Sequence, residues 1–180
     1  PEDPIALNPA KKTILVTCHR RENFGPGLLQ ICQALLELAQ RSDVEIILPV
    51  HRNPNVSSIF HDRLSGQRNI RLLEPLTYVP FIDLMRRSYL LITDSGGIQE
   101  EGPSLGKPIL VLREKTERPE AVQAGTVILV GTDSIRIVQQ ATQLLDNPSA
   151  YAAMTQRYNP YGDGHASERI AQALLHHLLP

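Results

Sequence analysis

The sequence is poor in cysteine, lacks long apolar runs and has almost no excess of either charge. Cys18 and Cys32 are the only cysteines among 180 residues, and neither has histidine or cysteine neighbours at the spacing of a zinc site. We therefore expect no disulfide framework and no metal site, but two reduced thiols in the core of a cytoplasmic protein. The apolar runs are too short to span a bilayer and residues 1–10 show no signal-peptide pattern, so no membrane association is expected.

The charges of the chain are balanced, with 18 Lys and Arg against 19 Asp and Glu and a net charge of −1. This balance gives no basic surface of the size that DNA or RNA needs, so nucleic acid is not an expected partner. Three motifs are also missing: a Walker A loop, a G-x-G-x-x-G after a strand, and a G-x-S-x-G elbow. Chemistry based on ATP, dinucleotides or a serine nucleophile therefore ranks low.

What the chain does have is a regular alternation of short β-rich apolar runs with helical patterns, which predicts parallel strands linked by crossover helices. We expect one α/β domain, a doubly wound Rossmann-like sheet of about six parallel strands with helices on both faces. The strands are predicted at 13–17, 45–50, 70–73, 89–93, 109–112 and 127–130. The helices are predicted at 28–38, 56–64, 79–86, 98–105, 134–145, 149–157 and 167–178.

Polar side chains follow the first two predicted strands at the point where each strand ends. His19 and Arg20 follow the first strand, and His51 follows the second. In an open parallel sheet ligands bind outside the carboxyl ends of the strands, so these residues are candidates for a cleft. A histidine beside arginines would hold a diphosphate and favour its departure as a leaving group. The alternative for both histidines is a purely structural role in a turn.

Residues 94–101 follow another apolar strand pattern, break at two glycines and continue as a predicted helix. Unpaired N–H groups at such a helix start favour a phosphate, and we predict that Ser95, Gly96 and Gly97 bind one. Glu101 lies one helical turn further on the same side, where its carboxylate would repel a phosphate but accept hydrogen bonds from a ribose diol. A nucleoside diphosphate fits this segment. The alternative is a glycine turn that serves packing.

Two further residues have both a binding and a structural interpretation. Phe81 is one of three phenylalanines and could stack on a base, although such a residue is more often part of the core. Arg118 precedes a proline suited to the first turn of a helix, and it could contact a phosphate or a sugar. Alternatively, Arg118 pairs with Glu117 or Glu120.

Taken together, these segments resemble the carboxyl-terminal domain of the non-hydrolysing UDP-N-acetylglucosamine 2-epimerases, a family with the glycosyltransferase-B architecture. The resemblance runs from about residue 12 to residue 178. It rests on seven blocks that occur in one order, at residues 19–23, 49–54, 93–101, 103–108, 116–120, 124–126 and 159–164. The chain would then be one half of a glycosyltransferase-B-type architecture.

The resemblance implies that UDP-N-acetylglucosamine and UDP-N-acetylmannosamine are interconverted without a cofactor, by anti elimination of UDP and its re-addition to the opposite face. Carried over by position, it implies several residue roles: His19 assists UDP departure, Ser95, Gly96 and Gly97 hold the diphosphate, Glu101 binds the ribose, Phe81 neighbours the uracil, and Arg20 and His51 contact a second, activating UDP-N-acetylglucosamine. Arg118 is a further candidate for the UDP site.

Enzymes of this family have an amino-terminal domain with the acidic residues that handle the C2 proton, and this chain contains no counterpart of it. We therefore interpret residues 1–11 as the remnant of an interdomain linker and residues 12–180 as the UDP-sugar-binding domain. The chain alone is expected to bind UDP but to be catalytically incomplete. The resemblance also implies a homodimer and a role in cell-surface polysaccharide biosynthesis.

Three alternatives share much of this pattern. A UDP-sugar glycosyltransferase domain would have the same fold and the ribose-binding glutamate, but would not need the block at residues 19–23. A non-catalytic UDP-sugar-binding module would bind without turnover even when an amino-terminal domain is supplied. A hydrolysing UDP-N-acetylglucosamine 2-epimerase would release free N-acetylmannosamine, and the Arg20 and His51 pair argues against it.

Overall fold

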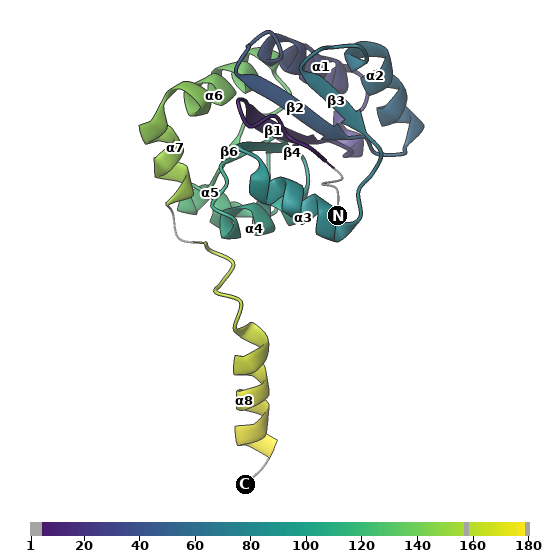
Figure 1. The fold of residues 1–180 in the computed structure, drawn as a ribbon. Helices are drawn as coiled ribbons and strands as arrows, with labels where there is room; N and C mark the ends of the chain where they lie inside the picture. The colour runs from purple at the N-terminus through teal and green to yellow at the C-terminus, as the bar shows by residue number, and fades with distance from the viewer. Residues whose placement is uncertain (1–4, 157–158, 179–180) are drawn as a thin grey trace.

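Six parallel strands form one sheet in the order β3-β2-β1-β4-β5-β6 (Figure 1). The computed structural model describes residues 5–156 and 159–178 of the chain. The strands are β1 Lys12–Thr17, β2 Val44–Pro49, β3 Ile70–Leu73, β4 Leu90–Thr93, β5 Ile109–Val111 and β6 Val127–Leu129. The helices are η1 Arg21–Asn23 (a 3-10 turn), α1 Pro26–Leu38, α2 Pro54–Leu64, α3 Tyr78–Arg87, α4 Gly96–Ser104, α5 Pro119–Ala124, α6 Ser134–Asp146, α7 Pro148–Thr155 and α8 Ala166–Leu178. The predicted doubly wound α/β fold is confirmed.

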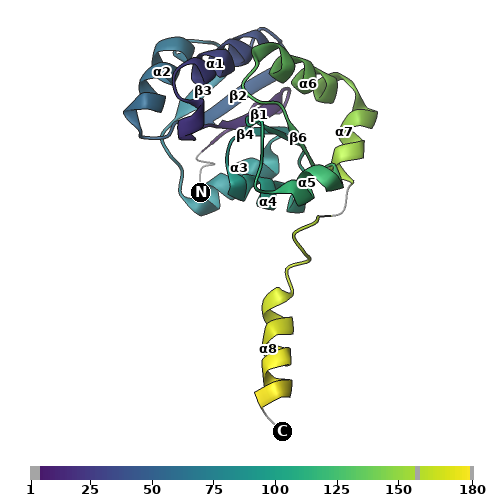
Figure 2. The same cartoon turned by 180° about the vertical axis from the view of Figure 1, so that it is seen from behind.

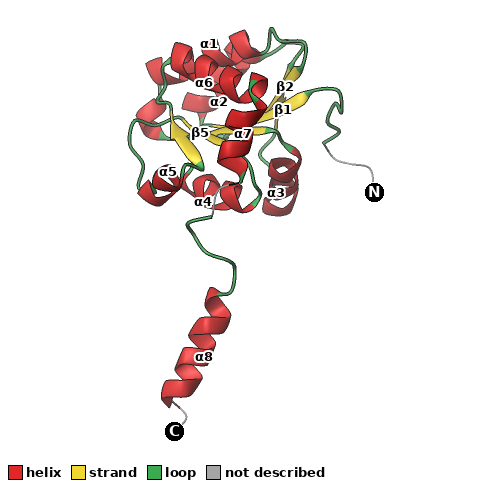
Figure 3. Ribbon diagram, turned by 90° about the vertical axis from the view of Figure 1, so that its left-hand side faces the viewer, coloured by secondary structure: helices red, strands yellow, loops and turns green. Residues whose placement is uncertain are grey.

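Helices cover both faces of the sheet, with α1, α2 and α6 on one face and α3, α4 and α5 on the other (Figures 1 and 3). Side chains alternate between the faces along each strand. In β1, for example, Ile14 and Val16 pack into the core under α1 and α2, whereas Leu15 packs into the second core with Ile98 of α4. Both cores are therefore built from the same continuous apolar strands.

In the crossover helix α2 the local sequence determines both where the helix starts and which face packs on the sheet. Asn53 caps its start, because its side-chain oxygen accepts a hydrogen bond from a backbone N–H of the first turn. Pro54 occupies the first helical position, where its missing N–H costs nothing. Val56, Phe60 and Leu64 recur at helical spacing and are fully buried, so they fix this helix on the sheet.

Two short elements were not predicted, and most predicted boundaries are right within two residues. The unpredicted elements are η1 and α5, although the proline that opens α5 had been recognised as a helix start. The predicted helix 149–157 ends at Thr155, and its last residue, Arg157, lies outside the described residues. Cys18 and Cys32 are both buried free thiols, as predicted.

The strand order reverses beside β1, which pairs with β2 on one side and with β4 on the other. Thr17 at the end of β1 is in register with Thr93 at the end of β4. The segments that follow these two strands therefore leave the sheet side by side, and this reversal point is where doubly wound sheets bind ligands.

The two ends of the chain differ in how they meet the sheet. Near the start, Ile5 is buried and the backbone N–H of Asn8 donates to the Glu45 carboxylate at 2.9 Å. Residues 1–4 of the predicted linker lie outside the described residues, and its assignment as a linker stays a prediction. At the other end α8 stands away from the body (Figures 1 and 2), and every one of its residues is exposed.

No helix in the described parts of the chain is long and apolar enough to cross a membrane.

Candidate nucleotide site at the carboxyl edge of the sheet

A cavity of about 360 Å³ opens at the carboxyl edge of β1, β2 and β4. Its walls come from the segments after these strands, from the approach to α3 and from the first turns of α3 and α4. The lining includes six of the nine predicted site residues: His19, His51, Phe81, Ser95, Gly97 and Glu101. Gly96, Arg20 and Arg118 lie beside it rather than in its lining.

The start of α4 forms one wall of the cavity. Ser95 is the N-cap residue, yet no side chain caps the first turn in the part of the chain that the structure describes. The first N–H groups of this helix are therefore available to a ligand. A Cβ built on Gly96 would lie 3.6 Å from Arg20 Nη2, 3.7 Å from Glu117 Oε1 and 3.9 Å from Arg118 Nη2, so two guanidinium groups and one carboxylate flank the turn. The uncapped N–H groups and the two guanidinium groups suit an anion such as a diphosphate.

Glu101 and Phe81 lie on neighbouring walls, and Tyr78 connects them. The Tyr78 hydroxyl donates a hydrogen bond to Glu101 Oε1 at 3.2 Å, and this bond to a carboxylate raises the pKa of Tyr78. Tyr78 and Phe81 are separated by one turn of α3, so both rings project from one side of the helix. Tyr78 was not predicted as a site residue, although its position one helical turn before Phe81 could have indicated it.

Asp94, directly after β4, binds the segment that follows β1 through its side chain. Its carboxylate is fully buried and accepts the backbone N–H of His19 at 2.9 Å and of Arg20 at 2.7 Å. The Asn23 side chain donates to it at 3.1 Å, and so does the Cys18 thiol at 3.1 Å. Burial, together with this neighbouring carboxylate, raises the pKa of Cys18 well above its ordinary value. The sulfur therefore stays a thiol and remains a donor.

The ring of His19 lies between this carboxylate and a second histidine. His19 Nδ1 is 3.4 Å from Asp94 Oδ1, and 40% of the His19 side chain is exposed. On its other side the ring stacks on His51, with centroids 5.4 Å apart and planes 14° from parallel. His51 Nδ1 accepts the backbone N–H of Asn53 at 3.0 Å. The predicted catalytic and activator histidines are thus in direct contact.

The two predicted arginines are held by glutamates. Arg20 Nη2 lies 3.0 Å from Glu117 Oε1, and Arg118 pairs with Glu100 of α4. The structural alternative for Arg118 was an ion pair with Glu117 or Glu120, but α4 brings Glu100 to its guanidinium instead. Since Glu100 and Arg118 are distant in sequence, only the packing of α4 beside the loop after β5 could reveal this pair.

A chain of ion pairs continues from Arg20 along the same edge. Glu117 also pairs with Arg113, whose Nε lies 2.6 Å from Glu22 Oε1. Beyond these residues is a second cavity of about 480 Å³, lined by Glu22, Asn23, Arg113, Glu114, Lys115, Gly131 and Thr132. It is larger, but it contains none of the predicted site residues. Within the described residues no group of three or more His, Cys, Asp or Glu is placed to hold a metal ion.

A family model described as UDP-N-acetylglucosamine 2-epimerase matches residues 2–175 of the chain. The chain belongs to this family. The UDP-N-acetylglucosamine 2-epimerase of Yersinia pestis is 55% identical over 172 residues, which make up 95% of this chain and 46% of that relative. The protein of the same name from Escherichia coli strain K12 is 54% identical over 169 residues, 93% of this chain and 45% of the relative. The chain therefore spans about half the length of the curated relatives it matches.

Solved structures of 2-epimerases share the fold closely. The Neisseria meningitidis UDP-GlcNAc 2-epimerase bound to UDP-GlcNAc has a TM-score of 0.90 and 49% identity, over 94% of this chain and 46% of its own. The co-structure of Staphylococcus aureus MnaA with UDP has a TM-score of 0.89 and 45% identity, over 94% of this chain and 47% of its own. The glycotransferase of kitacinnamycin, at 16% identity and a TM-score of 0.61, shares the fold alone. The match to half of each 2-epimerase agrees with the fold predicted for one half of a two-part enzyme.

Proposed function

We propose that this chain is the UDP-binding half of an enzyme that interconverts UDP-N-acetylglucosamine and UDP-N-acetylmannosamine. One observation carries the proposal: the start of α4, the Glu101 carboxylate and the His19 imidazole line the same cavity at the point where the strand order reverses. Further support comes from two related proteins of known structure, one bound to UDP-GlcNAc and one to UDP.

In the proposed complex the diphosphate lies against the first turn of α4, where it meets the N–H groups of Gly96 and Gly97 and the guanidinium of Arg118. The ribose hydroxyls donate to Glu101, whose carboxylate Tyr78 already holds in place. The uracil then lies over the wall that contains Phe81. Each part of UDP meets the kind of group that its chemistry needs.

The proposed reaction begins with elimination of UDP. The C2–H bond breaks and its electron pair forms the C1–C2 double bond, while the C1–O bond breaks and its pair remains on the β-phosphate oxygen. His19 donates a proton to that departing oxygen. Glu101 is the one acidic residue in the cavity lining that the structure describes, and it is assigned to the ribose. We assign the base for the C2 proton to the half of the relatives that this chain does not cover.

Arg20 and His51 remain the proposed contacts of a second UDP-sugar. His51 is exposed at the cavity edge, next to His19. Arg20 is held by Glu117 beside the glycine turn. A second ligand at this edge would reach the first through the stacked histidines.

Proton NMR of UDP-N-acetylglucosamine mixed with the chain tests the proposal. We expect broadened ligand signals without a new anomeric signal of the mannosamine epimer, because the chain binds but lacks its base. A growing epimer signal would show that the base lies within these residues, and free N-acetylmannosamine would indicate a hydrolysing enzyme. Ligand signals that stay sharp at high protein concentration would overturn the proposed binding site.

A matched pair of variants locates the ribose contact. Glu101→Gln is expected to weaken UDP binding about tenfold, since a charged hydrogen-bond acceptor is lost. It should also abolish the preference for UDP over its 2′-deoxy and 3′-deoxy forms. Glu37→Gln, an exposed change on α1, has the same charge difference and should leave both quantities unchanged. Equal effects of the two variants would contradict a ribose contact at Glu101.

A further inference from the structure

The Asp94 carboxyl group is fully buried, and four residues of one short segment donate hydrogen bonds to it. All four bonds end on Oδ2. The Cys18 thiol donates at 3.1 Å, the backbone N–H groups of His19 and Arg20 at 2.9 and 2.7 Å, and the Asn23 side chain at 3.1 Å. Removing a carboxylate from water is costly unless its oxygens are hydrogen-bonded, and here they are. The residues after β1 are therefore fixed to the end of β4 by a single side chain.

His19 makes a second approach to the same carboxylate through its ring. Its backbone N–H binds Asp94, which fixes the start of the side chain, and its Nδ1 then lies 3.4 Å from Asp94 Oδ1. A carboxylate oxygen accepts but cannot donate, so it favours a proton on the ring nitrogen that faces it. A proton on Nδ1 would leave Nε2 as the ring nitrogen that meets a ligand in the cavity.

We propose that Asp94 is a positioning residue that acts through His19, by holding a proton on Nδ1 in every state of the ring. This inference rests on the proposed function for the identity of the ligand. In the elimination step the imidazolium carries protons on both nitrogens and transfers the Nε2 proton to the departing β-phosphate oxygen. The ring is then neutral with its proton on Nδ1, and it recovers the Nε2 proton when UDP adds back.

The neighbouring histidine provides an internal contrast. His51 Nδ1 accepts the backbone N–H of Asn53 at 3.0 Å, so a neutral His51 carries its proton on Nε2. The two stacked rings, 5.4 Å apart, therefore have opposite tautomers. They share the same solvent and the same cavity edge, so a difference between them reports the hydrogen-bond partner of each ring.

Long-range proton–nitrogen correlation NMR of the chain tests the tautomers directly. The spectra are recorded at mildly alkaline pH, and the signals of His19 and His51 are assigned by their loss in His19→Gln and His51→Gln. We expect Nδ1 protonation for His19 and Nε2 protonation for His51. Asp94→Asn should shift His19 toward the Nε2 form and leave His51 unchanged. An Nε2-protonated His19 in the wild-type chain would overturn the proposal, whether or not the variant folds.

Binding of UDP and UMP shows whether the arrangement serves the departing phosphate. Asp94→Asn and His19→Ala are each expected to weaken UDP binding roughly tenfold, and the double variant no more than His19→Ala alone. UMP, which lacks the β-phosphate, should change by less than about twofold. Fully additive losses would overturn the proposal. If the wild-type chain shows the expected tautomers but does not bind UDP, the proposed function is contradicted instead.

Asn23→Ala is the control for a merely structural role. It removes a donor from the same carboxylate, and also a hydrogen bond to the Leu112 carbonyl, but it leaves the approach of Asp94 to the ring in place. We expect a lower unfolding midpoint with an unchanged His19 tautomer. A tautomer shift in Asn23→Ala equal to that in Asp94→Asn would show that loosening the segment is sufficient, and the positioning role would fail.

Discussion

The imidazole rings of His19 and His51 stack on each other, with centroids 5.4 Å apart and planes 14° from parallel. The two residues follow β1 and β2, which are neighbours in the sheet, so the contact is a direct consequence of the strand order. The ring proposed to assist UDP departure thus touches the ring proposed to meet a second UDP-sugar. Any ligand that moves His51 also changes the surroundings of His19.

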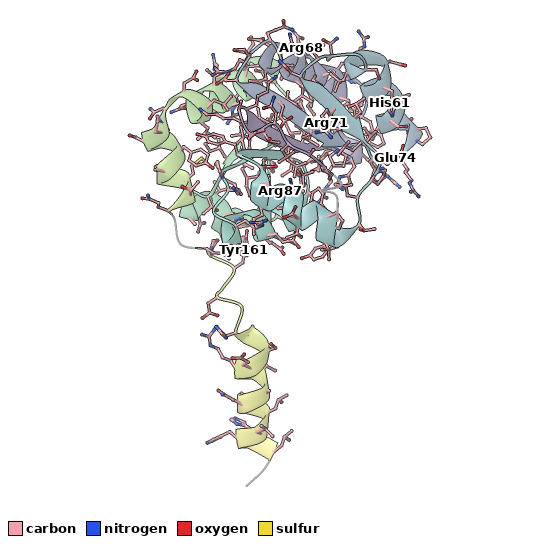
Figure 4. The ribbon with its side chains drawn as sticks, in the orientation of Figure 1. His61, Arg68, Arg71, Glu74, Arg87 and Tyr161 are labelled. Carbon is pink, nitrogen blue, oxygen red and sulfur yellow. The ribbon has the colours of Figure 1, made fainter. Side chains whose placement is uncertain are left out.

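We predict that His51→Ala removes a second binding event for UDP-N-acetylglucosamine while preserving the first. The first site keeps its glycine turn and its ribose carboxylate, so its affinity should change by no more than about twofold. Calorimetric titration of the chain measures both events. His61→Ala is the control, because His61 lies on the outer side of α2 (Figure 4) and is exposed. A titration curve identical to the wild type would contradict a second site at His51.

Gly102 is predicted to let α4 pack closely on the sheet. A Cβ at this position would lie 2.6 Å from Ile109 Cδ1 and 3.1 Å from Leu91 Cδ1, both on the strands beneath. Gly102→Ala should therefore lower the free energy of unfolding by about 1–3 kcal/mol, the usual cost of overpacking. Urea unfolding followed by circular dichroism measures the change. Wild-type stability would show that α4 can move away from β5 without penalty.

The opposite result is predicted for Gly97, in the same helix. A Cβ there meets only Ser95 Oγ, at 3.9 Å, so the folded chain has room for it. Gly97→Ala should keep or raise stability by about 0.5–1 kcal/mol, because alanine loses less entropy in a helix. Gly97 lines the cavity, so the added methyl group would take up space where we place the diphosphate, and we expect UDP binding to weaken about tenfold. Unchanged affinity in a stable variant would place the phosphates elsewhere.

Much of the fold followed from the sequence because parallel strands buried on both faces appear as continuous apolar runs. The run 89–93 was recognised in this way, and β4 occupies most of it. By contrast, α5 has only six residues and no apolar periodicity long enough to detect. Strand ends also indicated where the cavity would lie, since that rule needs only the strand direction.

The partners of the site residues could not be predicted, because each joins segments that are far apart in sequence. Asp94 was part of the recognised glycine-turn segment, but nothing in its local sequence shows that four donors from the segment after β1 would surround it. The pairing of Arg118 with Glu100 was not predicted, for the same reason. Such contacts depend on how two loops pack against each other, and neither hydrophobic periodicity nor a short motif predicts loop packing.

Cys32 is predicted to make the chain less stable in alkaline solution. Burial raises the pKa of its thiol from 9.0 to about 12. Between these values the unfolded chain has lost the proton and the folded chain retains it, so the folded state binds more protons and stability falls as the pH rises. Below pH 9 both states are protonated, and the contribution to the pH dependence vanishes.

Urea unfolding at a series of alkaline pH values measures this effect. Cys32→Ala should start from a lower stability at neutral pH, because a buried sulfur is lost, but should decline less steeply as the pH rises. In the native chain both thiols should resist a thiol reagent that labels them after unfolding, since each is buried. A rapid reaction of Cys32 in the native state, or an equally steep decline in the variant, would contradict the raised pKa.

The last prediction concerns α8, which adds little to the stability of the body. Each of its residues is exposed, including Ile170, Leu174 and Leu178, at 60%, 54% and 72% exposure. Ending the chain after Gly164 keeps Tyr161, which packs against the second core where the chain leaves the body (Figure 4), and should shift the thermal midpoint by no more than about 2 °C.

Ile170, Leu174 and Leu178 fall on one face of α8 at intervals of about one turn, and we expect this exposed apolar stripe to promote association between molecules. Replacing these three by glutamine keeps the helix length and should reduce self-association in sedimentation experiments to the level of the shortened chain. The 180-residue chain with the stripe intact should associate more strongly as its concentration rises. A large fall in the thermal midpoint after shortening would show instead that the stripe packs on the body and stabilises it, and the two variants would then differ from the wild type in stability rather than in association.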